Sequence, residues 1–259
     1  MFVMNGFCYL GVVPVRSNHQ SRSEQITQLL FGDRVKVLEQ FSGDNVVADS
    51  WLKIQNINDN YIGWVDKRNL LLSDTLLPEP NYIISSTIAK IQMDNDIITI
   101  PMASMLADKM FSIEGHKFSL VEGSVIAYNK RSPLLIKAIS LLLLNTPYQW
   151  GGKSIFGMDC SGFVQNVFSF AAVDLLRDAS MQARQGKDVA FNECAAGDLV
   201  FFDNPQTKNI NHVGIYLGNN KVIHCSGKVR IDNIDEKGIK PIGFEDIYSH
   251  HLCAVKRFF

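Results

Sequence analysis

The sequence predicts an α+β fold in which two small β-modules precede a domain of helices and antiparallel strands. Three observations predict it. From Val12 to Leu72, short alternating or apolar stretches are separated by turn clusters such as "FGD" and "NDN". The stretch "SPLLIKAISLLLL" then changes the pattern to that of an apolar helix. Beyond Ala195 the pattern returns to strands, so the last domain has its helices first and its sheet afterwards.

The first β-module is predicted over residues 1–77, where strands of five or six residues suit a small barrel or sandwich. The stretch "LLPEPN" disfavours regular structure and is typical of a linker. A second set of short strands follows it in "YIISSTIAKIQ", "DIITIP" and "HKFSLVEGSVIAYN". We therefore expect a second β-module over residues 78–130.

The third domain is predicted over residues 131–259 and opens with a helix. Ser132 and Pro133 fit the N-cap and first helical positions, and the near-continuous apolar surface after them predicts a buried helix. A second helix is predicted in "CSGFVQNVFSFAAV", whose apolar residues share one face. These residues are Phe163, Val164, Val167, Phe168 and Ala171. The strands that follow are "GDLVFFD", "NHVGIYLG", "KVIHCSG" and "LCAVKRFF".

Composition excludes several classes of protein. The 25 Lys and Arg residues against 26 Asp and Glu residues give a net charge of −1, which makes nucleic acid a poor partner. The longest apolar run, 141–144, is far shorter than the roughly 20 residues of a membrane span. The N-terminus does not read as a signal peptide, so we expect a cytoplasmic protein, or a periplasmic or secreted one if a leader has been removed. Five cysteines without a CxxC pair argue against a disulfide framework and a zinc finger.

Cys160 lies at the predicted start of the second helix, after the glycine-rich stretch "YQWGGKSIFGMD". The partial positive charge of a helix N-terminus favours a thiolate over a thiol. Cysteine is also among the most buried residue types, and most cysteines are inert. Position alone therefore leaves a nucleophile and a packing residue as equal alternatives.

The stretch "NHVGIYLGNNKVIHCS" is typical of two strands joined by a turn over residues 218–220. A three-residue loop would pair Leu217 with Lys221 and place His224 opposite Gly214.

Alternation places His212 on the same face as His224, within reach of its side chain. A histidine in such a strand is usually a hydrogen-bonded polar residue at a sheet edge. Two histidines on one face make a functional role and a structural role comparable alternatives. A nucleophilic thiol needs a base and a third group that orients the base. Cys160, His212 and His224 can supply all three.

Four motifs in this order resemble the NlpC-type papain-like cysteine peptidases, which cleave cell-wall peptides. They are "TPYQWGGKSIFGMDCSGFVQNVF", "LLRDASMQARQGKDV", "AAGDLVFF" and "NHVGIYLGNNKVIHCSG", and they cover most of residues 132–259. The resemblance implies a papain-like domain with Cys160 as nucleophile, His212 as general base and His224 as the orienting residue. It also implies that Tyr148 and the backbone N–H of Cys160 donate to an oxyanion.

The N-terminal stretches "VPVRSNHQSRSEQITQLLFGDRVKVLEQ" and "NDNYIGWVD" are similar to bacterial SH3-like domains attached to one branch of this family. The resemblance implies that both β-modules are SH3-like barrels. That branch resembles γ-D-glutamyl-L-diamino acid endopeptidases, which trim murein peptides bearing a free N-terminal L-alanine in cell-wall turnover or recycling.

The resemblance also implies a set of substrate-binding residues. An acidic residue and a tyrosine of the first barrel, best matched by Glu24 and Tyr61, would close one end of the site. Asp178 of the "RD" motif would receive the substrate amine. A free ammonium in a partly desolvated pocket needs a carboxylate partner, for which Asp159 is the second candidate. Ser161 completes the predicted set.

The sequence departs from the family pattern at three positions, with Leu176 in place of a usual proline, Ala179 in place of serine and Ile62 in place of glutamate. These departures concern substrate contacts. Without the resemblance, Asp178 would be interpreted as a solvated residue or a helix cap.

Two other functions stay open at this stage. One is a wall-binding or peptide-binding module with an inactive peptidase domain. The other is an amidase or acyltransferase on the same scaffold, which predicts an open apolar groove beside Cys160. We expect no cofactor, no metal and a monomer. The sequence does not distinguish meso-diaminopimelate from L-lysine as the third substrate residue.

Overall fold

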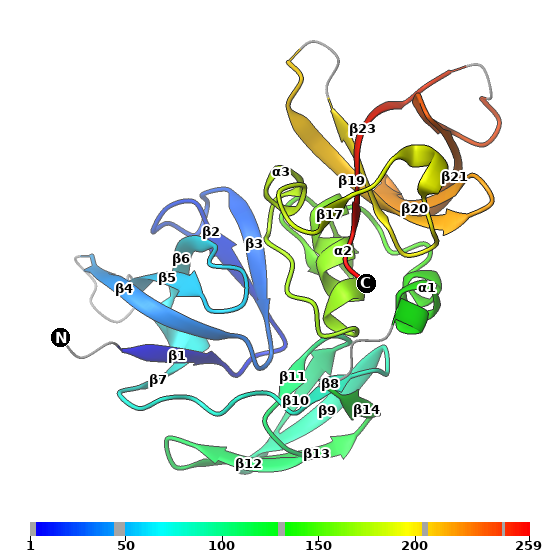
Figure 1. Ribbon diagram of the computed structural model, residues 1–259. Helices are drawn as coiled ribbons and strands as arrows, with labels where there is room; N and C mark the ends of the chain where they lie inside the picture. Colours follow the sequence, from blue (N-terminus) through cyan, green and yellow to red (C-terminus); the bar gives the residue numbers. More distant parts are fainter. Residues whose placement is uncertain (1–3, 44–49, 129–132, 204–206, 245–246) are drawn as a thin grey trace. The chain divides into compact units, whose positions relative to one another are not determined.

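The computed structural model describes residues 4–43, 50–128, 133–203, 207–244 and 247–259. The chain divides into two compact units. The first unit contains Met1–Lys130 together with Trp150–Ile155, and the second contains Arg131–Gln149 and Phe156–Phe259. Figure 1 shows the order of the elements along the chain. The α+β class predicted from the sequence is confirmed, with strands predominating over helices.

The first part of the first unit is a seven-stranded antiparallel sheet in the order β3-β2-β6-β5-β4-β1-β7. Alternation places Val13 and Val15 of β2 in its core, together with Leu52 and Ile54 of β5. A 3₁₀ turn over Lys67–Asn69 precedes the last strand. The strands are β1 Asn5–Cys8, β2 Val12–Arg16, β3 Gln25–Leu30, β4 Arg34–Ser42, β5 Ser50–Asn56, β6 Ile62–Asp66 and β7 Leu70–Ser73.

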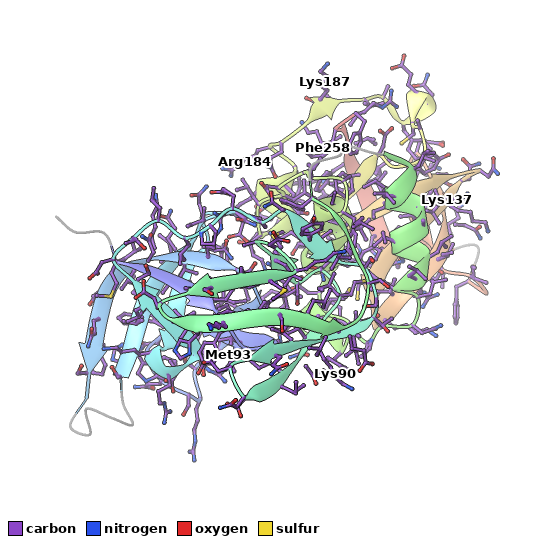
Figure 2. All side chains as sticks on the ribbon, turned by 90° about the horizontal axis from the view of Figure 1, so that it is seen from below. Lys90, Met93, Lys137, Arg184, Lys187 and Phe258 are labelled. Carbon is purple, nitrogen blue, oxygen red and sulfur yellow. The ribbon has the colours of Figure 1, made fainter. Side chains whose placement is uncertain are left out.

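The second part of the first unit has two smaller sheets, ordered β10-β9-β13-β12 and β11-β8-β14. In Figure 2, Lys90 and Met93 mark strand β9 of the larger one. The strands are β8 Tyr82–Ile84, β9 Ile88–Met93, β10 Asp96–Pro101, β11 Met105–Leu106, β12 Met110–Ile113, β13 His116–Glu122 and β14 Val125–Ala127.

One hydrophobic core joins the two parts of the first unit. The rings of Phe7 and Phe31 lie 5.5 Å apart, and Phe7 and Phe118 lie 5.8 Å apart, all in edge-on contact. Ile91 of β9 and Ile100 of β10, in the second part, belong to the same buried cluster. Burying these side chains together makes one compact unit of the two modules, because neither part covers this apolar surface alone. The division into separate domains at residue 77 stays a prediction.

The second unit is built on a sheet in the order β17-β23-β18-β19-β20-β21-β22, and a further pairing of β22 with β23 closes six of its strands into a ring. The strands of the second unit are β16 Gly157–Met158, which lies outside this sheet, β17 Lys187–Asp188, β18 Leu199–Asp203, β19 Ile210–Gly218, β20 Lys221–Ser226, β21 Lys228–Asp235, β22 Gly238–Lys240 and β23 His250–Arg257. Strand β15, Lys153–Ser154, belongs to the first unit. A 3₁₀ turn covers Phe191–Glu193.

Three helices complete the second unit, α1 Pro133–Leu142, α2 Cys160–Ser169 and α3 Ala179–Gln182. Helix α2 packs against β19 and β20 (Figure 1). Every residue of α2 from Cys160 to Phe168 is buried. No helix in the described part of the chain is long and apolar enough to cross a membrane.

Helix α1 begins at Pro133 as predicted, whereas the predicted N-cap Ser132 lies outside the described residues. The prediction that this helix is buried was wrong. Ile136 and Ile139 are buried, but Leu134 is 84% exposed and Leu142 is 62% exposed. Lys137 also lies on the exposed face (Figure 2). The helix therefore buries one stripe, as surface helices do, despite its apolar sequence.

The β19–β20 hairpin places His224 opposite Gly214 as predicted, but through a different turn. The predicted pair of Leu217 with Lys221 was wrong, because Lys221 pairs with Gly218 and the register shifts at Leu217. The two turn residues, Asn219 and Asn220, have φ angles of 52° and 54°. Two adjacent positive φ values are typical of a two-residue type I′ turn. The bulge then restores the register that a three-residue loop would have given.

Candidate active site

Cys160 is the first residue of α2, and the residue before it caps this helix. The Asp159 side chain accepts a hydrogen bond of 2.7 Å from the backbone N–H of Gly162. Cys160 is 8% exposed, and its Sγ lies 3.9 Å from the backbone oxygen of Asn211 in β19. The thiol therefore faces the strand residue that directly precedes His212.

A buried arginine holds the cap in place. The Arg177 guanidinium contacts both carboxylate oxygens of Asp159, at 3.0 and 2.5 Å, and donates to the Ser161 hydroxyl at 2.7 Å. Arg177 is 1% exposed. Both predicted substrate-binding residues of this segment, Asp159 and Ser161, thus lie in a buried network that fixes the start of α2. The carboxylate of Asp159 already binds Arg177 and a helix N–H, so this geometry favours a structural role for it.

His212 of β19 and His224 of β20 are brought together as predicted. The Nε2 of His212 lies 2.8 Å from the Nδ1 of His224, and their rings are nearly perpendicular at 85°. His212 is 6% exposed and His224 is 1% exposed. The nitrogen of His212 that remains for a reaction is therefore Nδ1.

Sequence reasoning missed Asp232, which continues this chain of contacts from β21. Its Oδ2 accepts a hydrogen bond of 3.0 Å from the Nε2 of His224. Burial alone would raise the pKa of Asp232, but hydrogen bonds from His224, the Ile242 N–H and Arg230 outweigh it and lower the pKa to about 2. Only the register of β20 with β21, unknown from the sequence, could have revealed this neighbour.

Sequence reasoning also missed His250, at the start of β23. Its ring stacks on that of His212 at 4.2 Å and 28°. Burial, and then the neighbouring His224, lower the pKa of His250 to about 4. The stacked ring covers one face of the buried His212 imidazole.

Burial favours the neutral forms of both the Cys160 thiol and the His212 imidazole. Burial raises the pKa of the Cys160 thiol to about 12, and the charge of Asp159 adds to this effect. Burial and the nearby His224 and His250 hold the pKa of His212 well below its usual value. The prediction that the helix N-terminus favours a thiolate is therefore outweighed by desolvation. A nucleophilic role for this thiol would therefore require a base that takes its proton during the reaction.

Tyr148 lies in the second unit near these groups and is 38% exposed. Its backbone N–H donates to the Gly227 oxygen at 2.9 Å. Burial, followed by the charges of Cys160 and Asp159, raises the pKa of Tyr148 to about 12. The hydroxyl group thus stays protonated near neutral pH and can donate a hydrogen bond.

Asp178 is half-buried and is the N-cap residue of α3, but its side chain makes no capping hydrogen bond. Its backbone oxygen accepts from the N–H groups of Met181 and Gln182, both at 2.9 Å. Gln182 in turn donates from its side chain to the backbone oxygen of Ser161 at 3.1 Å. The backbone at Asp178 is thereby tied to the start of α2, while its role toward a substrate stays a prediction.

Glu24 and Tyr61 belong to the first unit. The Glu24 carboxylate accepts a hydrogen bond of 2.7 Å from the Trp150 indole of the same unit. The backbone N–H of Tyr61 donates to Asp59 at 2.9 Å. Their substrate-binding role stays a prediction. Among the described residues, no group of three His, Cys, Asp or Glu side chains could hold a metal ion.

Comparisons with known proteins agree with this geometry. The model of the NlpC/P60 family matches residues 145–246, and that of the bacterial SH3 domain matches residues 11–70. A gamma-D-glutamyl-L-lysine dipeptidyl-peptidase of Bacillus subtilis is 32% identical over 249 residues, which are 90% of this chain and 81% of the relative. A probable endopeptidase NlpC homolog of Haemophilus influenzae is 42% identical over 97 residues, covering 36% of this chain and 50% of that protein.

A solved structure supports the fold. The crystal structure of an NlpC/P60 family protein from Bacillus cereus superposes with a TM-score of 0.77 at 18% sequence identity. It covers 98% of this chain and 99% of the other.

Proposed function

This chain belongs to the NlpC/P60 family of cysteine peptidases, and we propose that it hydrolyses the γ-D-glutamyl–diamino acid bond of murein peptides with a free N-terminal L-alanine. One observation carries the proposal. A thiol at a helix start lies beside a strand whose histidine is bonded to a second buried histidine at 2.8 Å. The dipeptidyl-peptidase relative, aligned over 90% of this chain, supports the substrate class.

The proposed reaction begins with attack of the Cys160 sulfur on the γ-carbonyl carbon of the D-glutamyl residue. The thiol proton passes to Nδ1 of His212, whose Nε2 is engaged by His224. The carbon–nitrogen bond then breaks, and the amine leaves with the proton from His212. Water, giving a proton to His212, hydrolyses the thioester and restores the thiol of Cys160.

The negative charge on the carbonyl oxygen needs hydrogen-bond donors during both attacks. The backbone N–H of Cys160 at the helix start is one proposed donor, and the Tyr148 hydroxyl is the other. The raised pKa of Tyr148 supports this role, because a protonated hydroxyl is a donor. Asp178 is the proposed partner of the substrate ammonium.

The test is hydrolysis of L-Ala-γ-D-Glu-meso-diaminopimelate and of its L-lysine counterpart, followed by mass spectrometry. We expect L-Ala-D-Glu and the free diamino acid as products. Cys160→Ala should abolish the reaction, and Cys253→Ala should retain it, since the Cys253 thiol bonds to the Phe201 oxygen in the sheet. Failure of the parent protein to cleave either peptide would refute the proposal.

The free-amine preference is tested with the N-acetylated forms of both peptides. An acetyl group removes the positive charge that Asp178 would pair, so we expect the parent to prefer the free amines. Asp178→Asn should weaken this preference, whereas Asp174→Asn, a change at an exposed position of the same segment, should not. Equal ratios in all three proteins would remove Asp178 from the proposal.

A further inference from the structure

A line of buried hydrogen bonds extends beyond the two histidines of the active site. It runs from His212 through His224 to Asp232, with distances of 2.8 and 3.0 Å. Asp232 is 1% exposed, as is His224. Because these groups are buried from water, the acceptor or donor capacity of each one determines which nitrogen of its neighbour carries a hydrogen.

The protons follow from the acceptor at the end of the line. An ionised carboxylate can only accept, so the Nε2 of His224 must carry a hydrogen that it donates to Asp232. A neutral His224 then has a bare Nδ1, which accepts from the Nε2–H of His212. A neutral His212 in turn has a bare Nδ1. This bare nitrogen is the base that the proposed reaction needs.

We propose that Asp232 is a positioning residue, which acts through His224 to keep His212 in the tautomer whose Nδ1 can accept the thiol proton. The inference rests on the proposed function for its catalytic consequence, but the tautomers themselves do not depend on any substrate. Asp232 lies two residues from the strand position paired with His224 and contacts no reacting atom of the proposed mechanism.

Two further donors occupy Oδ1 of Asp232 and leave Oδ2 to accept the hydrogen bond from His224. The Arg230 guanidinium donates to Oδ1 at 2.7 Å, and the Ile242 N–H donates to the same oxygen at 3.0 Å. Oδ2 is bonded to His224. While His224 carries its hydrogen on Nε2, all three groups are donors, and only a carboxylate can accept from all of them. The depressed pKa of Asp232 is consistent with this arrangement.

Asp232→Asn should therefore reverse the direction of both hydrogen bonds, from Asp232 to His224 and from His224 to His212. Its single oxygen would stay with Arg230 and Ile242, and its NH₂ group would face His224. His224 would then accept on Nε2 and carry its hydrogen on Nδ1. This hydrogen would be donated to Nε2 of His212, so the hydrogen of His212 would move to Nδ1, where the base is needed. Loss of the correct tautomer in a comparable hydrolase costs about 10⁴-fold in turnover.

The experiment compares the parent, Asp232→Asn and Asp235→Asn, each labelled with ¹⁵N-histidine. Asp235 is a matched control, because it lies on the same strand and bonds to Tyr248 at 2.7 Å instead of to a histidine. Nitrogen shifts report the tautomers, and hydrolysis of the free-amine tripeptide gives kcat and KM. Alkylation of Cys160 by iodoacetamide, followed by peptide mass spectrometry, reports proton removal without a substrate.

We expect hydrogens on Nε2 of both His212 and His224 in the parent and in Asp235→Asn, and on Nδ1 in Asp232→Asn. In Asp232→Asn, kcat should fall by about 10²- to 10⁴-fold, KM should change little, and alkylation of Cys160 should slow. Nδ1–H tautomers in the parent would overturn the inference, even if Asp232→Asn does not fold. So would a folded Asp232→Asn with unchanged tautomers and alkylation. If the parent shows the expected tautomers but cleaves no murein peptide, the proposed function fails and the positioning role stands.

Discussion

Arg177 illustrates how one buried side chain fixes the start of the helix that carries Cys160. Its guanidinium pairs with Asp159, which caps α2, and also donates to Ser161. Both charges of the pair are nearly inaccessible, at 1% and 7% side-chain exposure. Removing one partner of such a pair leaves the other charge buried without compensation.

We therefore expect Arg177→Gln to lower the free energy of unfolding by about 3–5 kcal/mol. The matched control is Arg68→Gln, because Arg68 pairs with Asp66 at 2.6 Å but is 62% exposed. Exposed pairs contribute about 0–1 kcal/mol. Urea unfolding of both variants measures the difference, and equal losses would contradict the role given to burial.

His250 provides a prediction for pH. Its pKa in the folded protein is about 4, below the roughly 6.5 of an unfolded chain. Between these values the unfolded chain takes up a proton that the folded chain does not, so the free energy of unfolding falls as the pH drops from 6.5 to 4. The buried His212 acts in the same direction.

The expected result is that His250→Phe, which keeps a stacked ring but cannot titrate, loses less stability than the parent between pH 7 and pH 4. Urea unfolding across this range is the measurement. His251→Phe removes an exposed neighbour whose charge helps to lower the pKa of His250, so its curve should lie between those of the parent and of His250→Phe. A His250→Phe curve that coincides with the parent curve would show that another group causes the loss.

At the scale of elements, the β19–β20 hairpin determines whether the two histidines meet. The sequence was sufficient to predict the pairing of His224 with Gly214, because alternation and a short turn allow few registers. It was not sufficient to predict the bulge at Leu217, since a two-residue turn with a bulge and a three-residue loop give the same register. Asp232 and Arg177 were missed for a related reason. Asp232 reaches the site from β21 and Arg177 from the irregular segment before α3, and the contacts of both depend on tertiary structure.

The turn itself can be tested through Asn220, which has a φ of 54°. Glycine adopts this conformation without the steric cost of a Cβ atom. Asn220→Gly should therefore raise the free energy of unfolding by up to about 1 kcal/mol, and Asn220→Val should lower it by about 1–2 kcal/mol. Thermal unfolding of the two variants measures this, and a fall in stability in Asn220→Gly would contradict the assigned turn.

At the scale of the whole molecule, composition and motifs predicted the α+β class and the family but did not reveal which segments distant in sequence pack together. Trp150–Ile155 belongs to the first unit although the residues on both sides belong to the second. The backbone N–H of Lys153 in this segment donates to the side-chain oxygen of Gln28 in β3 at 2.8 Å. Such a contact spans 125 positions of sequence, beyond the reach of local patterns.

Gly151 is the position at which this segment can be loosened in the intact protein. Its φ of +69° favours glycine, and a Cβ atom there would lie 2.5 Å from the backbone oxygen of Gln25 in β3. That oxygen cannot move as a side chain can, so Gly151→Ala should displace the segment from β3. The matched control is Gly197→Ala, because Gly197 also has a positive φ, of +100°, but nothing lies within 4 Å of its added Cβ atom.

The measurement is limited trypsin digestion after Lys153, whose side chain is 12% exposed in the intact protein. A residue held by hydrogen bonds is cleaved only when its segment opens, so cleavage reports the population of the open form. We expect faster cleavage after Lys153 in Gly151→Ala than in Gly197→Ala, with unchanged cleavage after Lys237 in an exposed turn of the second unit. Equal cleavage after Lys153 in both variants would mean that the collision with the Gln25 oxygen does not displace this segment from β3.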